Sequence, residues 1–311
     1  MKRILFYNSG GGLGDSIQLF TLILSLKKSY QNSEFFYLGA HENHFEGKLK
    51  EFGIKVITLE LGIKYFGFRW WHFFVAKKRF LKQNFSSLDL IIDLQSKLRN
   101  TIILKKLPHK NFYSSTFGYR FCSHQAIYTS KDHLTNLNLF LKNQIKISIF
   151  DLNLIPKKFI VEAERLLPNK DYVGFSVTQG NVYRKKSWHI ENFIKLAKEI
   201  SNKNKTPVFF IEKSNSALVD QIIARVPSAL FPEHDSDISC PALVTALSAR
   251  LDQAISIDNG VMHMISLANI PMTVLFGPTN SQKFAPVGNK IKILDSKKIY
   301  KLNDINSIKV E

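Results

Sequence analysis

The stretch ISIDNGVMHMISLANIPMTVLFGPTN (residues 255–280) joins a short apolar strand to an acid, an amide and a glycine, and continues as a helical segment and a second apolar strand. Asp258 or Asn259 can cap the helix, and Pro271 follows its end. His263 lies in the first turn, where the helix dipole disfavours a charged imidazole. The position therefore suits a neutral histidine, or a histidine with an anion beside it.

The same alternation of strand and helix patterns runs along most of the chain. Helical patterns lie between the expected strands, as in 190–200, where apolar residues recur at i, i+3, i+4 and i+7. The alternation predicts an α/β fold with parallel sheets, and because it restarts near residue 156 we expect two α/β halves. Residues 115–150 give no clear pattern. The expected strands are 3–7, 34–39, 55–59, 88–94, 172–177, 207–211, 228–231, 253–257 and 272–277.

The composition is that of a globular protein with excess positive charge. Its 43 Lys and Arg residues outnumber its 25 Asp and Glu residues, and the net charge of +18 suggests an anionic partner such as a phosphorylated substrate, a membrane surface or a nucleic acid. Cys122 and Cys240 form no metal-binding or disulfide pattern, so we expect a reducing compartment. No run of roughly 18 uncharged apolar residues predicts a membrane span, and a cytoplasmic location is expected.

The helix that contains His263 offers a place for an anion. In open parallel sheets, ligands bind beyond the carboxyl ends of the strands. The backbone amides at 260–262, together with the helix dipole, can bind a phosphate, and His263 can donate to a phosphate oxygen. The alternative is a capped helix with a satisfied histidine. A second loop, Gly-Pro-Thr at 277–279, follows the adjacent strand, and the two loops together favour a phosphate or nucleotide site.

This part of the chain resembles the C-terminal half of glycosyltransferase family 9, the lipopolysaccharide heptosyltransferases. That family carries an Asp-Ser/Thr-Gly-x-x-His segment, then Phe-Gly-Pro-Thr, then Pro-x-Gly. Asn259 stands where the family usually has a hydroxyl. The chain reads Asp258-Asn259-Gly260-Val261-Met262-His263, then Phe276-Gly277-Pro278-Thr279, then Pro286-Val287-Gly288.

A glycine-rich segment, SGGGLGDSIQ (9–18), lies near the N-terminus. It is no Walker loop, because Asp15 stands where a lysine is required. A carboxylate at a helix N-terminus suits either a cap or a general base, and the residues alone favour the cap. The segment is similar to the family's Gly-Asp-x-x-x-x-x-Pro-Ala, with Gln18 at a frequent histidine and Thr21 at the proline. The resemblance implies that Asp15 is the catalytic base and that Gly14 and Gln18 contact the acceptor.

A basic segment, RKKSWHIENF (184–193), precedes a helix and follows an expected strand. Two adjacent lysines are usually a solvated pair, which is the plain interpretation. The family has Lys-x-Trp-Pro before its corresponding helix, and this chain reads Lys-Ser-Trp from Lys186, with His189 in place of the proline. The resemblance implies that Lys186 contacts the leaving diphosphate, with Thr178 as a weaker candidate for the same phosphates.

A further segment, DLIIDLQSKLRN (89–100), resembles the family's Asp-x-x-Ile-Asp-x-Gln-Gly, with Ser96 at the glycine. Asp93 and Gln95 lie at the end of an expected strand and can line an acceptor cleft. A structural role for these two residues fits the sequence equally well.

Two more segments carry alternatives. Residues 64–82 interleave aromatic and basic side chains, which suits either a lipid headgroup region or a helix packed on the sheet with its lysines in water. The segment His-Asp-Ser-Asp (234–237) contains the Asp-x-Asp that binds a metal in other glycosyltransferases. Here it precedes a helical pattern and is interpreted as helix-capping residues, so no required metal is predicted.

Taken across the chain, the resemblance implies the GT-B architecture, in which two Rossmann-like domains with parallel sheets face each other across a cleft. Residues 1–155 would bind the acceptor, and residues 156–311 the nucleotide sugar, expected to be ADP-heptose. The implied reaction is an inverting, metal-independent transfer of a heptose or similar sugar to a lipopolysaccharide core, without a cofactor. The implied donor-binding residues are Thr178, Lys186, Asp258, Asn259, Gly260 and His263.

Other functions remain open at this point. A nucleotide-sugar epimerase or hydrolase of the same architecture would consume the donor without an acceptor, and a non-catalytic protein that binds anionic glycans would not depend on Asp15. Nucleic-acid binding is supported by the charge alone and is not expected. The expected partners are a nucleotide sugar and a lipid-linked anionic glycan, with peripheral contact to the inner membrane. We expect a monomer.

Overall fold

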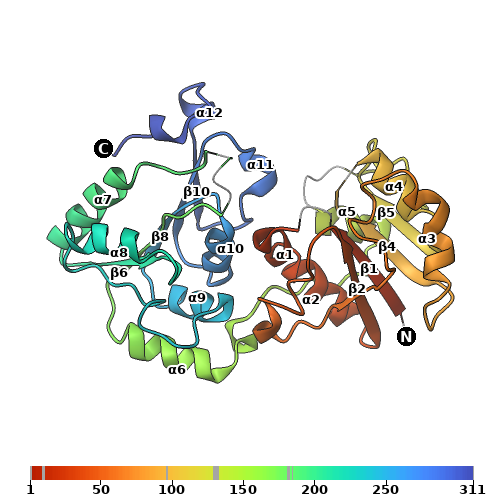
Figure 1. The fold of residues 1–311 in the computed structure, drawn as a ribbon, viewed down its shortest axis with the longest axis horizontal. Coiled ribbons are helices and arrows are strands. Elements are labelled where there is room, and N and C mark those ends of the chain that lie inside the picture. Colours follow the sequence, from red (N-terminus) through yellow and green to blue (C-terminus); the bar gives the residue numbers. More distant parts are fainter. Residues whose placement is uncertain are drawn as a thin grey trace. The chain divides into compact units, whose positions relative to one another are not determined.

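A computed structural model describes residues 2–8, 11–95, 97–128, 133–180, 183 and 185–310. The chain divides into two compact units, Met1–Phe150 (unit 1) and Asp151–Glu311 (unit 2). Each unit contains a parallel sheet with helices packed around it (Figure 1). Within the described ranges, no helix is both long enough and apolar enough to cross a membrane.

Unit 1, as far as it is described, has a five-stranded sheet in the order β3-β2-β1-β4-β5, and every pairing is parallel. Its strands are β1 (Lys2–Asn8), β2 (Ser33–Gly39), β3 (Ile57–Thr58), β4 (Leu88–Asp93) and β5 (His109–Ser114). Its helices are α1 (Leu13–Ile17), α2 (Phe20–Ser29), α3 (His72–Phe80), α4 (Leu98–Leu104) and α5 (His133–Phe140), with a 3-10 turn at Lys50–Phe52.

The central strand β1 shows why the sequence pattern was informative. Ile4, Leu5, Phe6 and Tyr7 are fully buried, as expected for a parallel strand covered on both faces. The segment between β1 and β2 forms two helices, α1 and α2. Strand β5 was not predicted.

Unit 2 also has a five-stranded parallel sheet in its described part, in the order β10-β9-β8-β6-β7. Its strands are β6 (Tyr172–Ser176), β7 (Thr206–Phe210), β8 (Gln253–Ile257), β9 (Met272–Phe276) and β10 (Ile291–Asp295). Its helices are α6 (Lys157–Leu166), α7 (Ile190–Asn202), α8 (Ser216–Ile223), α9 (Pro241–Ser248), α10 (Gly260–Leu267), α11 (Ser281–Phe284) and α12 (Ser296–Ile299), with 3-10 turns at Leu152–Leu154 and Ile305–Ser307.

Two expectations for unit 2 differ in outcome. The apolar face predicted for 190–200 is confirmed, because Phe193 and Ala197 of α7 are buried in the core and their neighbours at helical spacing pack against it. The strand expected over 228–231 is wrong, since this segment makes a single parallel bridge, between Leu230 and Val208 of β7.

Both sheets contain a point at which the strand order reverses. In unit 1 the chain builds β2 and β3 on one side of β1, and then places β4 on the other side. In unit 2 the reversal lies between β6, which pairs with β7, and β8. Ligands of open α/β sheets bind at the carboxyl ends of the strands at such points. The loops after β1 and β4, and after β6 and β8, are therefore the places to look for a site.

Candidate functional site

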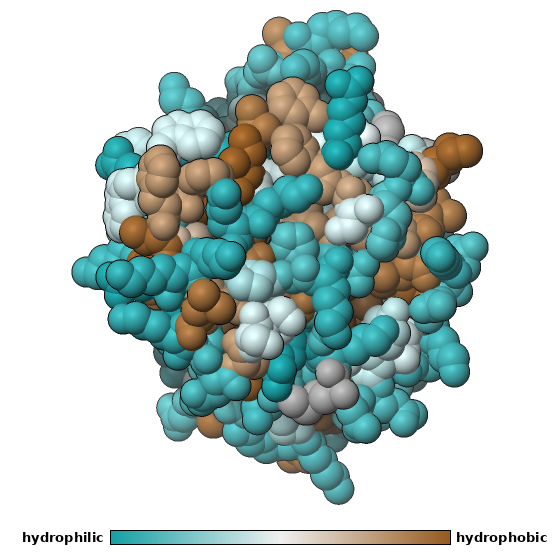
Figure 2. All heavy atoms as spheres, turned by 90° about the vertical axis from the view of Figure 1, so that its right-hand side faces the viewer, coloured by the Kyte–Doolittle hydropathy of each residue, from teal (hydrophilic) through white to brown (hydrophobic). Residues whose placement is uncertain are grey.

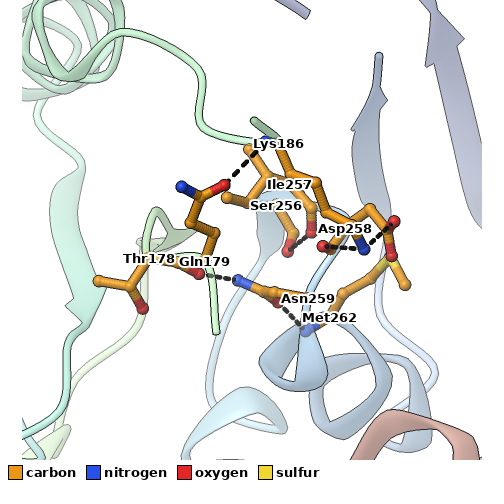
Figure 3. Close-up of polar contacts among 8 residues, drawn as sticks. All are labelled: Thr178, Gln179, Lys186, Ser256, Ile257, Asp258, Asn259 and Met262. Carbon is orange, nitrogen blue, oxygen red and sulfur yellow. Dashed lines mark hydrogen bonds and ion pairs between the residues drawn. The ribbon is translucent and has the colours of Figure 1, made fainter. Parts of the chain in front are cut away.

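Asn259 connects the two loops at the reversal point of unit 2. Its Oδ1 atom accepts a hydrogen bond from the Met262 amide (2.8 Å) and so caps α10. Its Nδ2 group donates to the Thr178 carbonyl (2.8 Å) in the loop after β6 (Figure 3), and to Oγ of Ser176 (2.7 Å), the last residue of that strand. A serine or threonine hydroxyl has one proton and can make only one donated bond, so asparagine adds a connection that the usual family residue lacks.

The start of α10 presents backbone donors. The cap occupies the amide of Met262, whereas the amides of Gly260 and Val261, the first two residues of the helix, have no intrahelical acceptor. Both residues are half-buried. Together with the partial positive charge of the helix N-terminus, these amides favour an anion at this point.

Lys186 and Asp258 form a buried ion pair beside the helix start. Lys186 Nζ lies 2.5 Å from Asp258 Oδ2 and 3.3 Å from the Asp258 carbonyl, and only 14% and 7% of the two side chains are exposed (Figure 3). The Lys186 amide donates to Gln179 Oε1 (2.7 Å). The ammonium predicted from the Lys-x-Trp segment is therefore brought to the same loops as Asn259 and Gly260.

The segment after Lys186 is anchored to the C-terminal part of the chain. Trp188 is buried, and its Nε1 donates to the Ile308 carbonyl (2.8 Å). Gly277, after β9, packs so closely on Ile305 that an added Cβ would lie 2.6 Å from the Ile305 nitrogen. The tryptophan of this segment and the glycine of the Gly-Pro-Thr loop thus have structural roles that the sequence did not distinguish from ligand binding.

His263 is buried in the first turn of α10 and follows Asp258, Asn259 and Gly260 in the sequence. Burial lowers its pKa, the negative charge of Asp258 opposes this shift and the positive charge of Lys186 adds to it, with a net pKa of about 4. The imidazole is therefore neutral at neutral pH, which resolves the difficulty of a histidine near a helix N-terminus.

Asp15, in α1, follows the glycine-rich loop after β1. Its carboxylate is half-buried and accepts a hydrogen bond from the Gly12 amide (3.3 Å), so it does act as a helix-capping group. His44 fixes the glycine-rich loop, because its Nε2 donates a hydrogen bond to the Gly11 carbonyl (3.0 Å). Gly11 has φ of 65° and lies against His41 with no room for a Cβ, which explains a glycine at this position.

The other acceptor candidates occupy different environments. Gly14 is half-buried within α1, and Gln18 is exposed at the C-cap of the same helix. Ser9, Gly10 and Ser96, which belong to the segments singled out above, lie outside the described residues.

Asp93 is fully buried at the end of β4. Its carboxylate accepts from the Gln95 amide (3.0 Å), Thr101 Oγ1 (2.5 Å) and Ser114 Oγ (2.8 Å). Of the two interpretations of this acid, these contacts favour the structural one. Gln95 is half-buried, and its Nε2 donates to Asn8 Oδ1 (2.6 Å), so it joins the loops after β4 and β1.

The Asp-x-Asp segment does not cap α9. The N-cap of that helix is Cys240, and no side chain caps it. Asp235 instead offers its carbonyl to Arg165 (2.9 Å). Over the described ranges, no group of three or more His, Cys, Asp or Glu side chains is arranged to hold a metal ion.

Sequence reasoning missed Ser176 and Gln179, which hold Asn259 and the Lys186 backbone in place. The available signal was their position at the carboxyl end of the first strand of unit 2. Sequence reasoning named Thr279 only as part of the Gly-Pro-Thr loop and gave it no role, although its Oγ1 is enclosed and has no hydrogen-bond partner among the described residues.

A sequence model of glycosyltransferase family 9 (heptosyltransferase) matches residues 77–310, which is most of the chain. The chain belongs to glycosyltransferase family 9. This family 9 protein is thus a glycosyltransferase, and the epimerase and binding-protein alternatives are disfavoured. No curated protein matches its sequence.

Solved structures share the fold of this family 9 chain. A family 9 glycosyltransferase from Veillonella parvula has 17% identity and a TM-score of 0.66, with 99% of this chain and 94% of that chain covered. E. coli heptosyltransferase WaaC with ADP has 14% identity and a TM-score of 0.62, with the same coverage. A UDP-GlcNAc 2-epimerase from Methanocaldococcus jannaschii has 13% identity and a TM-score of 0.52, covering 96% and 90%.

These likenesses confirm the predicted fold class, GT-B, with one Rossmann-like parallel sheet in each unit. The fold is shared by transferases and an epimerase and does not by itself decide the reaction. The family match decides that the family 9 chain transfers sugars.

Proposed function

We propose that this family 9 enzyme moves a heptose or similar sugar from ADP-heptose to a lipopolysaccharide core acceptor, with inversion and without a metal. The observation that supports it best is the meeting of Lys186, the first amides of α10 and neutral His263 at the reversal point of unit 2. An ammonium, free amide donors and a helix dipole together suit the diphosphate of a nucleotide sugar. The similar WaaC was solved with ADP.

In the proposed reaction, Asp15 accepts the proton of an acceptor hydroxyl. The hydroxyl oxygen forms a bond to the anomeric carbon, and the bond from that carbon to the diphosphate oxygen breaks on the opposite face. The electron pair leaves with ADP, so negative charge grows on the diphosphate. Lys186 and the amides of Gly260 and Val261 stabilise this charge in the transition state, and neutral His263 donates to it.

The two units take different parts in this proposal. Unit 2 binds the nucleotide sugar, with Thr178, Asp258 and Asn259 shaping the loops around the diphosphate. Unit 1 binds the acceptor, with Gly14, Gln18 and Gln95 near the loop that carries Asp15. The enzyme is proposed to act as a cytoplasmic monomer, without a cofactor, at the inner face of the inner membrane, where it meets a lipid-linked anionic glycan.

The variant Asp15→Asn tests the proposed base. Asparagine is almost the same size and cannot accept a proton, so transfer should fall at least about 10²-fold while ADP still raises the melting temperature. Asp220→Asn, an equal change at an exposed aspartate of α8, serves as the control and should keep full activity. Turnover of Asp15→Asn at the wild-type rate would remove Asp15 from its role.

The donor is tested by the same thermal shifts with ADP, UDP and GDP. A ligand that binds only the folded state at 100 times its Kd adds about 2.7 kcal/mol of stability, so ADP should give the largest shift. If no nucleoside diphosphate shifts the transition, unit 2 is not the donor site. Consumption of ADP-heptose in the absence of any acceptor would point to a hydrolase or epimerase instead.

A further inference from the structure

Helix α3 and the residues that flank it expose large apolar side chains. The residues buried against unit 1 recur at i, i+4 and i+8: His72, Ala76 and Phe80. On the opposite side of the helix, and at the turns just before and after it, three large apolar side chains are exposed by 56%, 79% and 56%: Trp70, Phe74 and Leu81. Trp71, which is 54% exposed, lies beside them in sequence.

This arrangement departs from the usual amphipathic helix. A helix on the surface of a globular protein normally turns charged or polar residues to the solvent. Single exposed apolar residues are common and need no explanation. Here Phe74 of α3 and the flanking residues Trp70 and Leu81 recur at i, i+4 and i+11, which is the spacing of one helix face, so they form a stripe. Apolar stripes of this kind mark interaction sites.

The charge around the stripe is of one sign. Residues 61–88 contain six Lys or Arg residues and no Asp or Glu. Lys77 and Lys78 are both exposed and flank the stripe on α3. Neighbouring cations also lie on aromatic rings, as Lys106 does over Phe73 at 4.1 Å. A partner of this face therefore has to offer both an apolar layer and negative charge.

We call the exposed residues Trp70, Trp71, Phe74, Lys77, Lys78 and Leu81 the α3 surface. Figure 2 views the molecule from the side on which α3 lies in Figure 1, and it shows hydrophobic side chains at the surface interleaved with hydrophilic ones. The α3 surface belongs wholly to unit 1, and none of its residues takes part in the donor loops of unit 2.

We propose that the α3 surface docks on an anionic lipid bilayer, with α3 lying parallel to the membrane plane. The tryptophan, phenylalanine and leucine side chains enter the boundary between headgroups and acyl chains, and Lys77 and Lys78 contact the headgroup phosphates. The inference rests on the proposed function in one respect, because a lipid-linked acceptor requires the enzyme to work at a bilayer.

Charge complementarity favours a bilayer over a second copy of the chain. Two α3 surfaces facing each other would bring Lys77 and Lys78 of one copy against the same lysines of the other, with no acidic residue in 61–88 to balance them. An anionic bilayer supplies a continuous layer of negative headgroups above an apolar interior, which matches both parts of the α3 surface.

The test measures binding of the full-length protein, without donor or acceptor, to vesicles of phosphatidylcholine with and without phosphatidylglycerol. We expect co-sedimentation with the anionic vesicles, weakening as salt is raised, and little binding to the neutral ones. Trp70 and Trp71 are exposed whereas Trp188, the remaining tryptophan, is buried, so emission should shift to shorter wavelengths on binding. Equal binding to neutral vesicles, or no binding, would overturn the proposal.

Two pairs of variants assign the binding to the α3 surface. Phe74→Ser with Leu81→Ser should weaken vesicle binding by about tenfold or more, whereas Ile127→Ser with Ile149→Ser, which removes two equally exposed apolar side chains of unit 1, should not. Lys77→Gln with Lys78→Gln should weaken it by about tenfold or more, whereas Lys195→Gln with Lys198→Gln on α7 should not.

Further measurements separate the outcomes. All these side chains are exposed, and circular dichroism should confirm that each variant is folded. The ADP-induced thermal shift and transfer to a delipidated acceptor in solution should stay at wild-type levels, so a failure of membrane docking leaves the donor proposal standing. Vesicle binding unchanged in both α3 variants would overturn the inference. If the α3 variants lose only affinity for the delipidated acceptor, the α3 surface binds a glycan instead. If they lose only self-association, it binds a second copy of the chain.

Discussion

Lys186 and Asp258 depend on each other for burial. A charge enclosed with its partner is tolerated, but a charge left alone in the same place keeps its desolvation cost. Both side chains are largely enclosed, and Oδ2 of Asp258 has the Lys186 ammonium at 2.5 Å. The residue that is proposed to contact the diphosphate therefore also neutralises an acid of the protein.

The single variant Lys186→Met should lower the free energy of unfolding by about 3–5 kcal/mol, because it leaves the Asp258 carboxylate buried and unpaired. The double variant, with Asp258→Asn added, should recover most of this loss. Urea denaturation of the two proteins at pH 7 measures the difference. Equal stability of the single and double variants would show that the ion pair does not matter for folding.

His263 makes stability depend on pH. Its pKa is about 4 in the folded protein and about 6.5 in the unfolded chain, so the unfolded chain binds the proton more readily between these values. The contribution is fully present above pH 6.5 and is lost as pH falls toward 4, by about 3 kcal/mol. In the variant His263→Gln this part of the loss should be absent when unfolding is followed across the same window.

Glu233 changes the stability in the opposite direction over an overlapping range of pH. Burial raises its pKa to about 7, the hydrogen bond from Ser239 opposes the shift, and Glu212 adds to it. Its contribution is present below about pH 4.5 and is lost as pH rises through 7. Because Glu233 is unchanged in the His263 variant, the difference between the two proteins isolates the histidine. Parallel stability curves would contradict a neutral, buried His263.

At the scale of the element, the loop after β9 is held by the turn at Ile305–Ser307. Gly277→Ala would place a methyl group 2.6 Å from the Ile305 backbone nitrogen, and backbone cannot swing aside as a flexible side chain can. We expect a loss of about 1–3 kcal/mol in unfolding free energy. Gly180→Ala is the matched control, since none of the described residues lies within 4 Å of its added Cβ. Equal losses of unfolding free energy in the two variants would mean that the turn at 305–307 moves to accommodate the methyl group at no cost.

Most strands that the sequence predicted are buried apolar runs, and they include β7, which lies at the edge of its sheet but is buried over 207–210. Strands such as β1 and β8 are continuous apolar runs, and the helix face through Phe193 repeats at helical spacing. The missed strands, β5 and β10, lie at the edges of their sheets, and more than half of their residues are polar or exposed. A strand with so many polar or exposed residues lacks the continuous apolar run of a buried parallel strand, so its sequence carries a weaker signal.

The candidate site, too, could be predicted from the sequence only in part. Motif spacing brought Lys186, Asp258 and His263 to one place, because all three lie close to the carboxyl ends of central strands. It could not show that Asp93 is enclosed by Thr101 and Ser114, since a strand-end acid looks alike in sequence whether it faces solvent or the interior. Hydrogen bonds between segments distant in the chain have no local signature.

At the scale of the whole molecule, the chain passes once from unit 1 to unit 2, after Phe150. Each unit has a core of its own, one built around residues 5–112 and the other around residues 173–308. Every contact described above for the donor loops lies within unit 2. The loops that are proposed to bind the donor are therefore held by contacts within a single unit.

Residues 151–311 expressed alone should fold and bind ADP with an affinity within about tenfold of the full chain, because no donor contact is lost. Isothermal titration of the fragment and of the full chain gives the comparison, with the Lys186→Met fragment as the control that should lose binding. A folded fragment with no affinity for ADP would show that unit 1 contributes to the donor site.

The three hydrogen bonds of Asn259 should also slow a chemical change at this residue. An asparagine followed by glycine is the pair most prone to deamidation, in which the next backbone nitrogen attacks the side-chain amide and ammonia is released. Conversion to aspartate would remove both donated bonds and set a second carboxylate beside Asp258. While both ends of the Asn259 side-chain amide are hydrogen-bonded, this group cannot turn toward the Gly260 nitrogen. Deamidation at this position therefore requires the loop to open first.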